Sequence, residues 1–123
     1  MSRFNSKPRE AKSSLGIVPK VWGKEIWIVN EKEYCAKFLV LRKGAQCSYH
    51  YHPKKKETFY AIRGEAILTL EGKDYILNPF SPPKTILPKQ KHSFYGLRSS
   101  VILEVSTHHD DKDTIRLSNS KPQ

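Results

Sequence analysis

The chain has 123 residues, 37% of them hydrophobic, and a formal net charge of +10 at pH 7. A chain of this length forms one domain with its own core rather than two. No apolar stretch reaches the roughly 18 residues that a membrane-spanning helix needs, and the N-terminal segment lacks the apolar core of a secretory signal. We therefore expect a cytoplasmic, single-domain protein with no membrane partner.

The positive charge is concentrated near the N-terminus. Residues 1–24 contain six Lys or Arg against Glu10 alone, so they supply five of the ten net charges. A basic, polar segment of this kind is typical of a solvated arm, and no nucleic-acid-binding motif accompanies it. We expect residues 1–20 to form a flexible basic arm that can add an edge strand, and we expect no nucleic-acid partner. The domain is expected over residues 21–117, followed by a disordered tail over residues 118–123.

Short apolar runs separated by turn residues predict strands along the rest of the chain. In chain order, the predicted strands cover residues 25–29, 36–42, 47–52, 57–63, 65–70, 73–77, 85–87, 91–96 and 101–106. Nine short strands at this spacing indicate an all-β fold, an antiparallel sandwich or barrel. No longer segment has helical periodicity, and residues 110–116 are expected to make one helical turn at most. Cys35 and Cys47 are too few for a disulfide scaffold, so we expect both as reduced packing residues.

Two histidines and a glutamate form the most informative pattern in the sequence. In the strand predicted over residues 47–52, alternation places Ser48, His50 and His52 on one face. The polar, proline-led segment 53–56 then predicts a hairpin loop that returns Glu57 beside the two imidazoles. Neutral imidazoles and a carboxylate are the ligands that divalent first-row ions bind.

A third histidine, His92, completes the predicted ligand set. It follows the basic turn that begins at Pro88 and precedes an apolar strand. We therefore predict one divalent metal ion bound by four side chains: His50, His52, Glu57 and His92. This ligand set does not choose among manganese, iron, nickel and zinc.

These residues carry a resemblance to a known family. Gly44, His50, His52, Glu57 and Gly64 match the first cupin motif, GxxxxxHxHxxxxExxxxxxG, without a gap or substitution. The resemblance covers about residues 22–107 and implies a cupin jelly-roll β-barrel, a double-stranded β-helix, with the ion inside.

The second cupin motif is matched in part. Pro88 and His92 fit it, whereas Lys89 stands where the family usually has glycine and Gly96 replaces its common asparagine. The departure at Lys89 concerns the tight turn that precedes His92.

Within the cupins, the segments WGKEIWIVN, CSYHYHPKKKETFY and EVSTHHDDKDTIRL are similar to small sugar-isomerase cupins. Type II mannose-6-phosphate isomerase and D-lyxose isomerase are the examples. This resemblance implies a metal-dependent enzyme, an aldose–ketose isomerase acting on a sugar or sugar phosphate. Two alternatives stay open: a non-catalytic, metal-containing cupin that binds a sugar or nucleotide sugar, and an iron-dependent dioxygenase.

The catalytic role of one residue depends on which face of a strand looks inward. Along residues 101–106, Glu104 shares a face with Ile102 and Ser106, opposite three apolar side chains. If that face looks into the barrel, Glu104 is a buried carboxylate near the ion and the candidate general base. If it looks outward, Glu104 is a surface residue.

Other polar and aromatic groups have more ordinary interpretations. We expect the lysines of segment 54–56 to be solvated rather than to bind phosphate, and we expect the pair 108–109 to be solvated histidines. Tyr49, Tyr51 and Tyr75 are expected to form an outer aromatic patch, which suits a homodimer.

Overall fold

The structure is a computed structural model that describes residues 16–123, so residues 1–15 of the predicted arm lie outside the described part. The described residues contain eleven strands and one short 3₁₀ helix, Asp111–Asp113. In chain order the strands are β1 (Gly16–Lys20), β2 (Gly23–Asn30), β3 (Cys35–Leu41), β4 (His50–Tyr51), β5 (Glu57–Arg63), β6 (Ala66–Leu70), β7 (Lys73–Leu77), β8 (Lys84–Ile86), β9 (His92–Gly96), β10 (Ser100–Ser106) and β11 (Ile115–Arg116).

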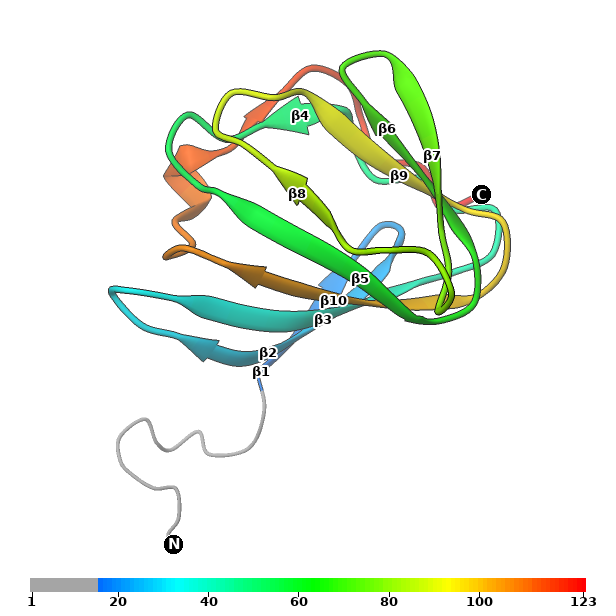
Figure 1. Ribbon diagram of the computed structural model, residues 1–123, viewed down its shortest axis with the longest axis horizontal. Coiled ribbons are helices and arrows are strands. Elements are labelled where there is room, and N and C mark those ends of the chain that lie inside the picture. The colour runs from blue at the N-terminus through cyan, green and yellow to red at the C-terminus, as the bar shows by residue number, and fades with distance from the viewer. Residues whose placement is uncertain (1–15) are drawn as a thin grey trace, which may run out of the picture.

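The strands form two facing antiparallel sheets. The larger sheet has the order β1-β2-β3-β10-β5-β8, and the smaller has the order β11-β4-β9-β6-β7. Figure 1 shows the two sheets as the lower and upper walls of a barrel that is open toward the end where β5 begins. This arrangement confirms the all-β, jelly-roll fold. The sheet order also explains why distant segments meet, since β10 pairs with both β3 and β5.

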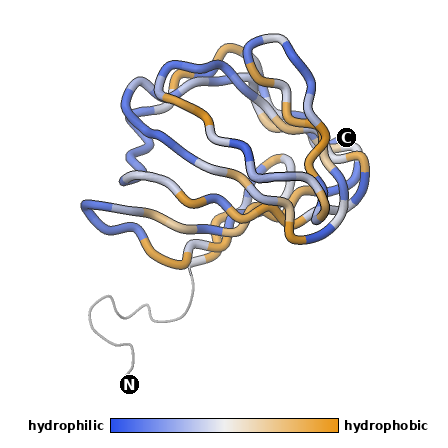
Figure 2. Tube along the Cα trace, in the orientation of Figure 1, coloured by the Kyte–Doolittle hydropathy of each residue, from blue (hydrophilic) through white to orange (hydrophobic). Residues whose placement is uncertain are grey.

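Alternation along the strands builds the interior. In β3 every second residue is buried, and Leu39 and Leu41 pack into the core. Phe59 and Phe94 come from opposite sheets and meet edge to face, with ring centroids 4.7 Å apart. Figure 2 shows that hydrophilic segments prevail at the open end, on the left of the view. The apolar core therefore fills the closed part of the barrel, and polar groups gather at its mouth.

The last glycine of the first cupin motif occupies a position that no other residue fits. Gly64 has φ +83°, and a Cβ there would lie 2.2 Å from the carbonyl oxygen of Ser99. The turn between β5 and β6 thus needs both a left-handed backbone and the absence of a side chain.

Both ends of the described chain join the sheets. The N-terminal end adds the edge strand that the sequence allowed, whereas the pairing of the C-terminal end differs from the predicted tail. β1 lies within the predicted arm and pairs with β2 as an edge strand. After β11, Lys121 exchanges backbone hydrogen bonds with Gln46, and Ser118 Oγ accepts from the Tyr49 N–H. The residues predicted as a tail therefore add pairing beside β4. Sequence patterns did not reveal this because the segment is polar and aperiodic.

The structure also bears on the predicted state of the two cysteines and on the predicted absence of a membrane-spanning helix. Cys35 and Cys47 are buried free thiols, and the Phe94 N–H donates to Cys47 Sγ at 3.0 Å. Within residues 16–123, no helix is long or apolar enough to span a membrane.

Candidate metal centre

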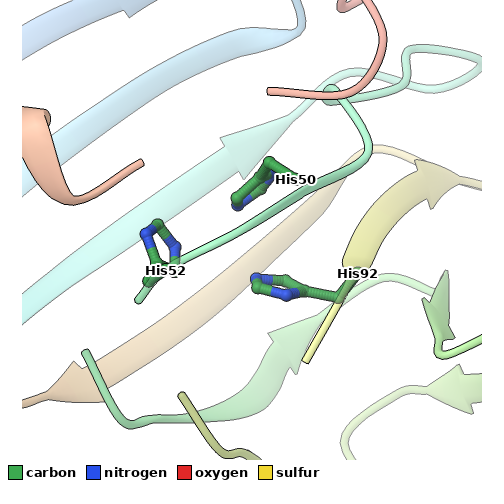
Figure 3. A group of neighbouring side chains, drawn as sticks. All are labelled: His50, His52 and His92. Carbon is green, nitrogen blue, oxygen red and sulfur yellow. The ribbon is translucent and has the colours of Figure 1, made fainter. Parts of the chain in front are cut away.

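Three imidazoles converge between the two sheets. His50 on β4 and His92 on β9 are paired directly across antiparallel strands, and their ring centroids lie 4.4 Å apart. His52 follows β4 by one residue, so alternation turns it the same way as His50. One ring nitrogen from each of the three lies within 4.8 Å of the others, and Figure 3 shows the rings surrounding a common space.

Hydrogen bonds fix which nitrogen of each ring is available. Nδ1 of His50 donates to the carbonyl oxygen of Ser48 at 2.8 Å, and Nδ1 of His92 donates to that of Gln90 at 2.9 Å. Nδ1 of His52 lies 3.0 Å from the carbonyl oxygen of Asp113. Because a carbonyl only accepts, all three rings carry their proton on Nδ1 when neutral. Each Nε2 is left with its lone pair, the arrangement that metal-binding histidines have.

Glu57 joins this group from the opposite sheet. Its Oε2 lies 2.9 Å from Nε2 of His92 and 3.3 Å from Nε2 of His52. Neither Glu57 Oε2 nor His92 Nε2 has a hydrogen-bond partner among the described residues, although both are buried. Two buried lone pairs that face each other at this distance repel unless a cation lies between them. The donor set therefore fits a divalent metal ion.

The charge states of these groups agree with a ligand role. Burial, aided by the neighbouring His92, lowers the pKa of His50 to about 3, so its imidazole is neutral at pH 7. Burial alone would raise the pKa of Glu57, but the neighbouring Lys55 ammonium favours the ionised form, and the pKa lies well below its usual range. Neutral imidazoles and an ionised carboxylate are the forms that bind a metal.

The strand face that carries Glu104 looks into the barrel. Ile102, Glu104 and Ser106 are all buried, with Glu104 only 3% exposed. Its Oε2 accepts a hydrogen bond of 2.9 Å from Nζ of Lys55. Burial and the neighbouring Glu57 carboxylate raise the pKa of Glu104. The structure thus places the candidate general base inside the pocket, one lysine away from Glu57.

Lys55 contradicts the expectation that segment 54–56 is solvated. Lys54 and Lys56 are exposed, but Lys55 is only 3% exposed and points inward. Its Nζ lies 3.3 Å from Oε1 of Glu57 and 2.9 Å from Oε2 of Glu104. Burial disfavours its charge, but Glu104 and Glu57 outweigh this effect and raise the pKa of Lys55 to about 12. The sequence gives no sign that Lys55 differs from its two exposed lysine neighbours. Its partners Glu57 and Glu104 lie on separate strands, β5 and β10, and meet it only in the folded chain.

A second group of charged and titratable side chains, which runs from the buried Lys37 to the exposed Asp111, lies beside this bridge. His109, expected to be solvated, accepts at Nδ1 from Nζ of Lys55 at 2.9 Å, and its Nε2 lies 2.8 Å from Oδ1 of Asp111. Nζ of Lys37, a residue only 1% exposed, lies 3.4 Å from the same Nδ1 and 3.4 Å from Oε1 of Glu25. His108 is exposed, as expected. One inward-pointing lysine on an otherwise apolar strand, Lys37, is the sequence signal that could have indicated this group.

The pocket beside the histidines is lined by both polar and apolar side chains. Its polar lining includes Lys37, Lys55, Glu104 and His109, together with His50, His52 and Glu57. Its apolar lining includes Cys47, although alternation over residues 47–52 would place Cys47 on the opposite face from His50. The paired strand begins only at His50, so strict alternation does not extend back to Cys47.

The turn before His92 adopts the backbone conformation of the cupin motif even though Lys89 replaces the usual glycine. Lys89 adopts φ +74°, the left-handed conformation that glycine usually supplies, and its N–H donates to the carbonyl oxygen of His52 at 2.7 Å. At the other end of β9, a Cβ on Gly96 would meet the carbonyl oxygen of Arg42 at 2.5 Å. Lys89 therefore supplies the backbone conformation that the turn needs, and Gly96 occupies a position at the end of β9 that leaves no room for a side chain.

Comparison with known protein families gives one match, which covers part of the chain. Residues 37–81 match the family described as "Cupin domain", a range that contains His50, His52 and Glu57. This match and the jelly-roll fold both support the resemblance to the cupin superfamily that the first motif indicates. No curated protein sequence matches the chain.

Solved structures resemble the chain at low sequence identity. KdgF from Halomonas sp. has a TM-score of 0.67 and 18% identity, over 72% of this chain and 81% of KdgF. A variant of Streptomyces PAC13 with uridine has a TM-score of 0.75 and 11% identity, over 94% of this chain and 93% of PAC13. The capsular polysaccharide assembling protein CapF from Staphylococcus aureus has a TM-score of 0.71 and 14% identity, over 85% of this chain and 34% of CapF. The chain thus spans about one third of CapF, and at these identities the likeness establishes the fold.

Proposed function

We propose that this cupin binds one divalent metal ion, manganese, iron, nickel or zinc, through His50, His52, His92 and Glu57. The proposal is supported by the unpartnered lone pairs of Glu57 and His92 and by the fixed Nδ1 protons of the three histidines. A bound ion of this kind supplies a Lewis acid that polarises a carbonyl group.

The activity that fits this site best is the interconversion of an aldose and a ketose, with a sugar or sugar phosphate as substrate. The observation that carries this proposal is the burial of Glu104 against the pocket, which provides a carboxylate where the reaction needs a base. Glu104 takes the proton from C2 of the aldose and returns it to C1, while the proton of the C2 hydroxyl passes to the C1 oxygen, so that C2 becomes the carbonyl carbon of the ketose. The Lys55 ammonium, held between Glu104 and Glu57, positions the carboxylate and favours negative charge on the substrate oxygens.

The test is solvent-deuterium exchange during turnover. The metal-loaded protein is incubated in D₂O with a panel of aldoses and their phosphates, and NMR records ketose formation, deuterium at C1 of the ketose and deuterium at C2 of the recovered aldose. Glu104→Gln keeps the shape but removes the base, so we expect it to lower the rate by about 10²- to 10⁴-fold. Lys54→Gln, an exposed change on the same loop as Lys55, is the matched control and should retain the rate. Absence of both ketose and deuterium incorporation with the wild-type protein across the panel would overturn the isomerase proposal.

The second candidate function is a non-catalytic module that binds a sugar or nucleotide sugar. Its specific support is the ion pair between Glu104 and Lys55, which engages the carboxylate in the ligand-free protein. The likeness to PAC13 with uridine and to a capsular polysaccharide assembling protein is compatible with such ligands. Ligand binding by calorimetry without any exchange of substrate protons would favour this function over the isomerase.

A homodimer and a cytoplasmic location also stay proposals. The predicted aromatic patch does not form one surface, because Tyr75 lies on β7, with β9 and β6 between it and β4, where Tyr51 lies. The dimer proposal rests instead on the outer face of the larger sheet. Ile26, Phe38 and Leu103 lie there on neighbouring strands in one register row.

A further inference from the structure

The segment between β10 and β11 lies against the proposed metal centre, although it falls outside the residues that match the cupin family. From Ser106 the chain leaves the larger sheet, forms the 3₁₀ helix Asp111–Asp113 and enters the smaller sheet at β11. Figure 1 shows this segment, drawn in orange, at the open end of the barrel. We call residues 107–114 the crossing segment.

One residue of the crossing segment, Asp113, contacts two parts of the metal motif. Its carboxylate accepts from the backbone N–H of Lys54 and of Lys55, each at 2.9 Å. Its carbonyl oxygen accepts from Nδ1 of His52 at 3.0 Å. Bonds from N–H groups to an ionised carboxylate are stronger than neutral ones, so the pair of contacts holds the loop after His52 firmly.

The consequences reach three groups of the pocket. The carbonyl of Asp113 fixes the His52 proton on Nδ1 and so directs Nε2 toward Glu57. The carboxylate fixes the backbone of Lys55, whose side chain turns inward to pair with Glu57. The next residue, Thr114, adds a contact of 3.2 Å between its Oγ1 and Nδ1 of His52.

We propose that Asp113 is a positioning residue for the metal centre, so that the crossing segment is part of the ion-binding apparatus. This inference rests on the proposed metal site. Residues that orient a metal-binding histidine affect affinity strongly, and their loss commonly weakens binding by about 10- to 100-fold. Asp113 touches no metal ligand through its carboxylate, so its effect is transmitted through the loop and the His52 ring.

The test measures metal affinity directly. Apo protein is titrated with Zn²⁺ by calorimetry and with Co²⁺ by visible absorption, whose spectrum reports the geometry of the ligands. We expect Asp113→Ala to weaken binding by about 10- to 100-fold and to alter the Co²⁺ spectrum. Asp113→Asn keeps one carboxamide oxygen as acceptor and should recover part of the affinity.

The matched control is Asp110→Ala. Asp110 lies in the same segment and accepts from the N–H of Lys112 as the cap of the 3₁₀ helix, and its side chain makes no hydrogen bond to the histidines or the lysine loop within the described residues. The substitution should destabilise the helix while leaving the Zn²⁺ affinity and the Co²⁺ spectrum as in the wild type. Thermal unfolding of each apo variant separates a general loss of stability from a specific loss of affinity.

The outcomes distinguish this inference from the proposed function. If the wild-type protein binds neither Zn²⁺ nor Co²⁺, the metal centre itself is overturned. If the wild type binds and Asp113→Ala binds equally well with the same spectrum, the positioning role is overturned and the metal centre stands. Equal losses in the Asp110 and Asp113 variants would also overturn it, since they would show an effect of segment stability alone.

Discussion

At the scale of single residues, Lys55 is the group on which the interior electrostatics depend. It is buried between the carboxylates of Glu57 and Glu104, and its Nζ also donates to His109. Removing a cation from such a group leaves two carboxylates without their counter-charge in a medium of low polarity. The intact ion pair contributes little net stability, because the attraction between the charges mainly offsets the free energy lost when they are buried. Removing the lysine loses that attraction but leaves the carboxylates buried, so the free energy of unfolding falls by more than the net contribution of the pair.

We therefore predict that Lys55→Met destabilises the metal-free protein by about 3–5 kcal/mol at pH 7, as measured by urea unfolding. The loss should shrink as the pH falls, because the burial that raises the pKa of Glu104 lets a proton neutralise that carboxylate. Lys54→Met and Lys56→Met, at exposed positions on either side, should change stability by less than about 0.5 kcal/mol. Equal effects at all three positions would contradict the bridging role of Lys55.

At the scale of elements, the larger sheet has an outer face that no described element covers. Across five strands, Ile17, Ile26, Phe38, Leu103 and Tyr60 form one register row. Residues at its margins are well exposed, among them Ile17 at 60% and Val105 at 48%. A continuous apolar face of this kind is typical of protein–protein contact, and a second copy with the same face can bury it symmetrically.

We predict that the wild-type protein has a solution mass of twice 14.2 kDa by light scattering, and that Leu103→Lys shifts it to the monomer. A lysine placed in the middle of the apolar row would have to be buried without a partner in the dimer. Ile76→Lys, at an exposed position of the smaller sheet, is the control and should leave the mass unchanged. A wild-type protein that is monomeric at all accessible concentrations would overturn the homodimer.

At the scale of the whole molecule, the buried imidazoles make the metal-free fold sensitive to acid. Burial, with the charges of Lys55 and Lys37, lowers the pKa of His109 to about 4, and burial lowers that of His50 to about 3, from an ordinary 6.5. In the unfolded chain both rings gain a proton near pH 6.5, whereas in the folded protein they remain neutral. Above pH 6.5 the two rings are neutral in both states and do not affect stability. As the pH falls toward 4 the unfolded chain takes up protons that the folded protein does not, so the folded protein loses stability.

We predict that the metal-free protein loses stability between about pH 6.5 and pH 4, by on the order of 3 kcal/mol for each of these two histidines. Urea unfolding at a series of pH values in the presence of a chelator measures this slope. His109→Gln should flatten it, whereas His108→Gln, at an exposed position, should not. A slope that is the same in both variants and in the wild type would contradict the assigned role of His109.

The sequence could predict those parts of the site that depend on residues close together in the chain, and not those that depend on contacts between distant strands. The spacing of His50, His52 and Glu57 is local, since strand alternation and one hairpin loop suffice to bring them together. His92 is predicted from its place between a basic turn and an apolar strand, and it also matches the second motif, although that motif lacks its usual glycine. The burial of Lys55 and the inward turn of His109 could not be predicted, because each depends on partners from strands far apart in the chain.

By itself, the sequence determined the all-β class, nearly all the strands of the barrel and the four side chains that the structure brings together. These follow from periodicity and spacing, which act over a few residues. Only the tertiary structure decided that Glu104 faces the pocket, that Lys55 bridges two carboxylates and that Asp113 holds the loop behind His52. The face of a strand and the partner of a charge are set by the pairing of distant segments, and that pairing exists only in the folded chain.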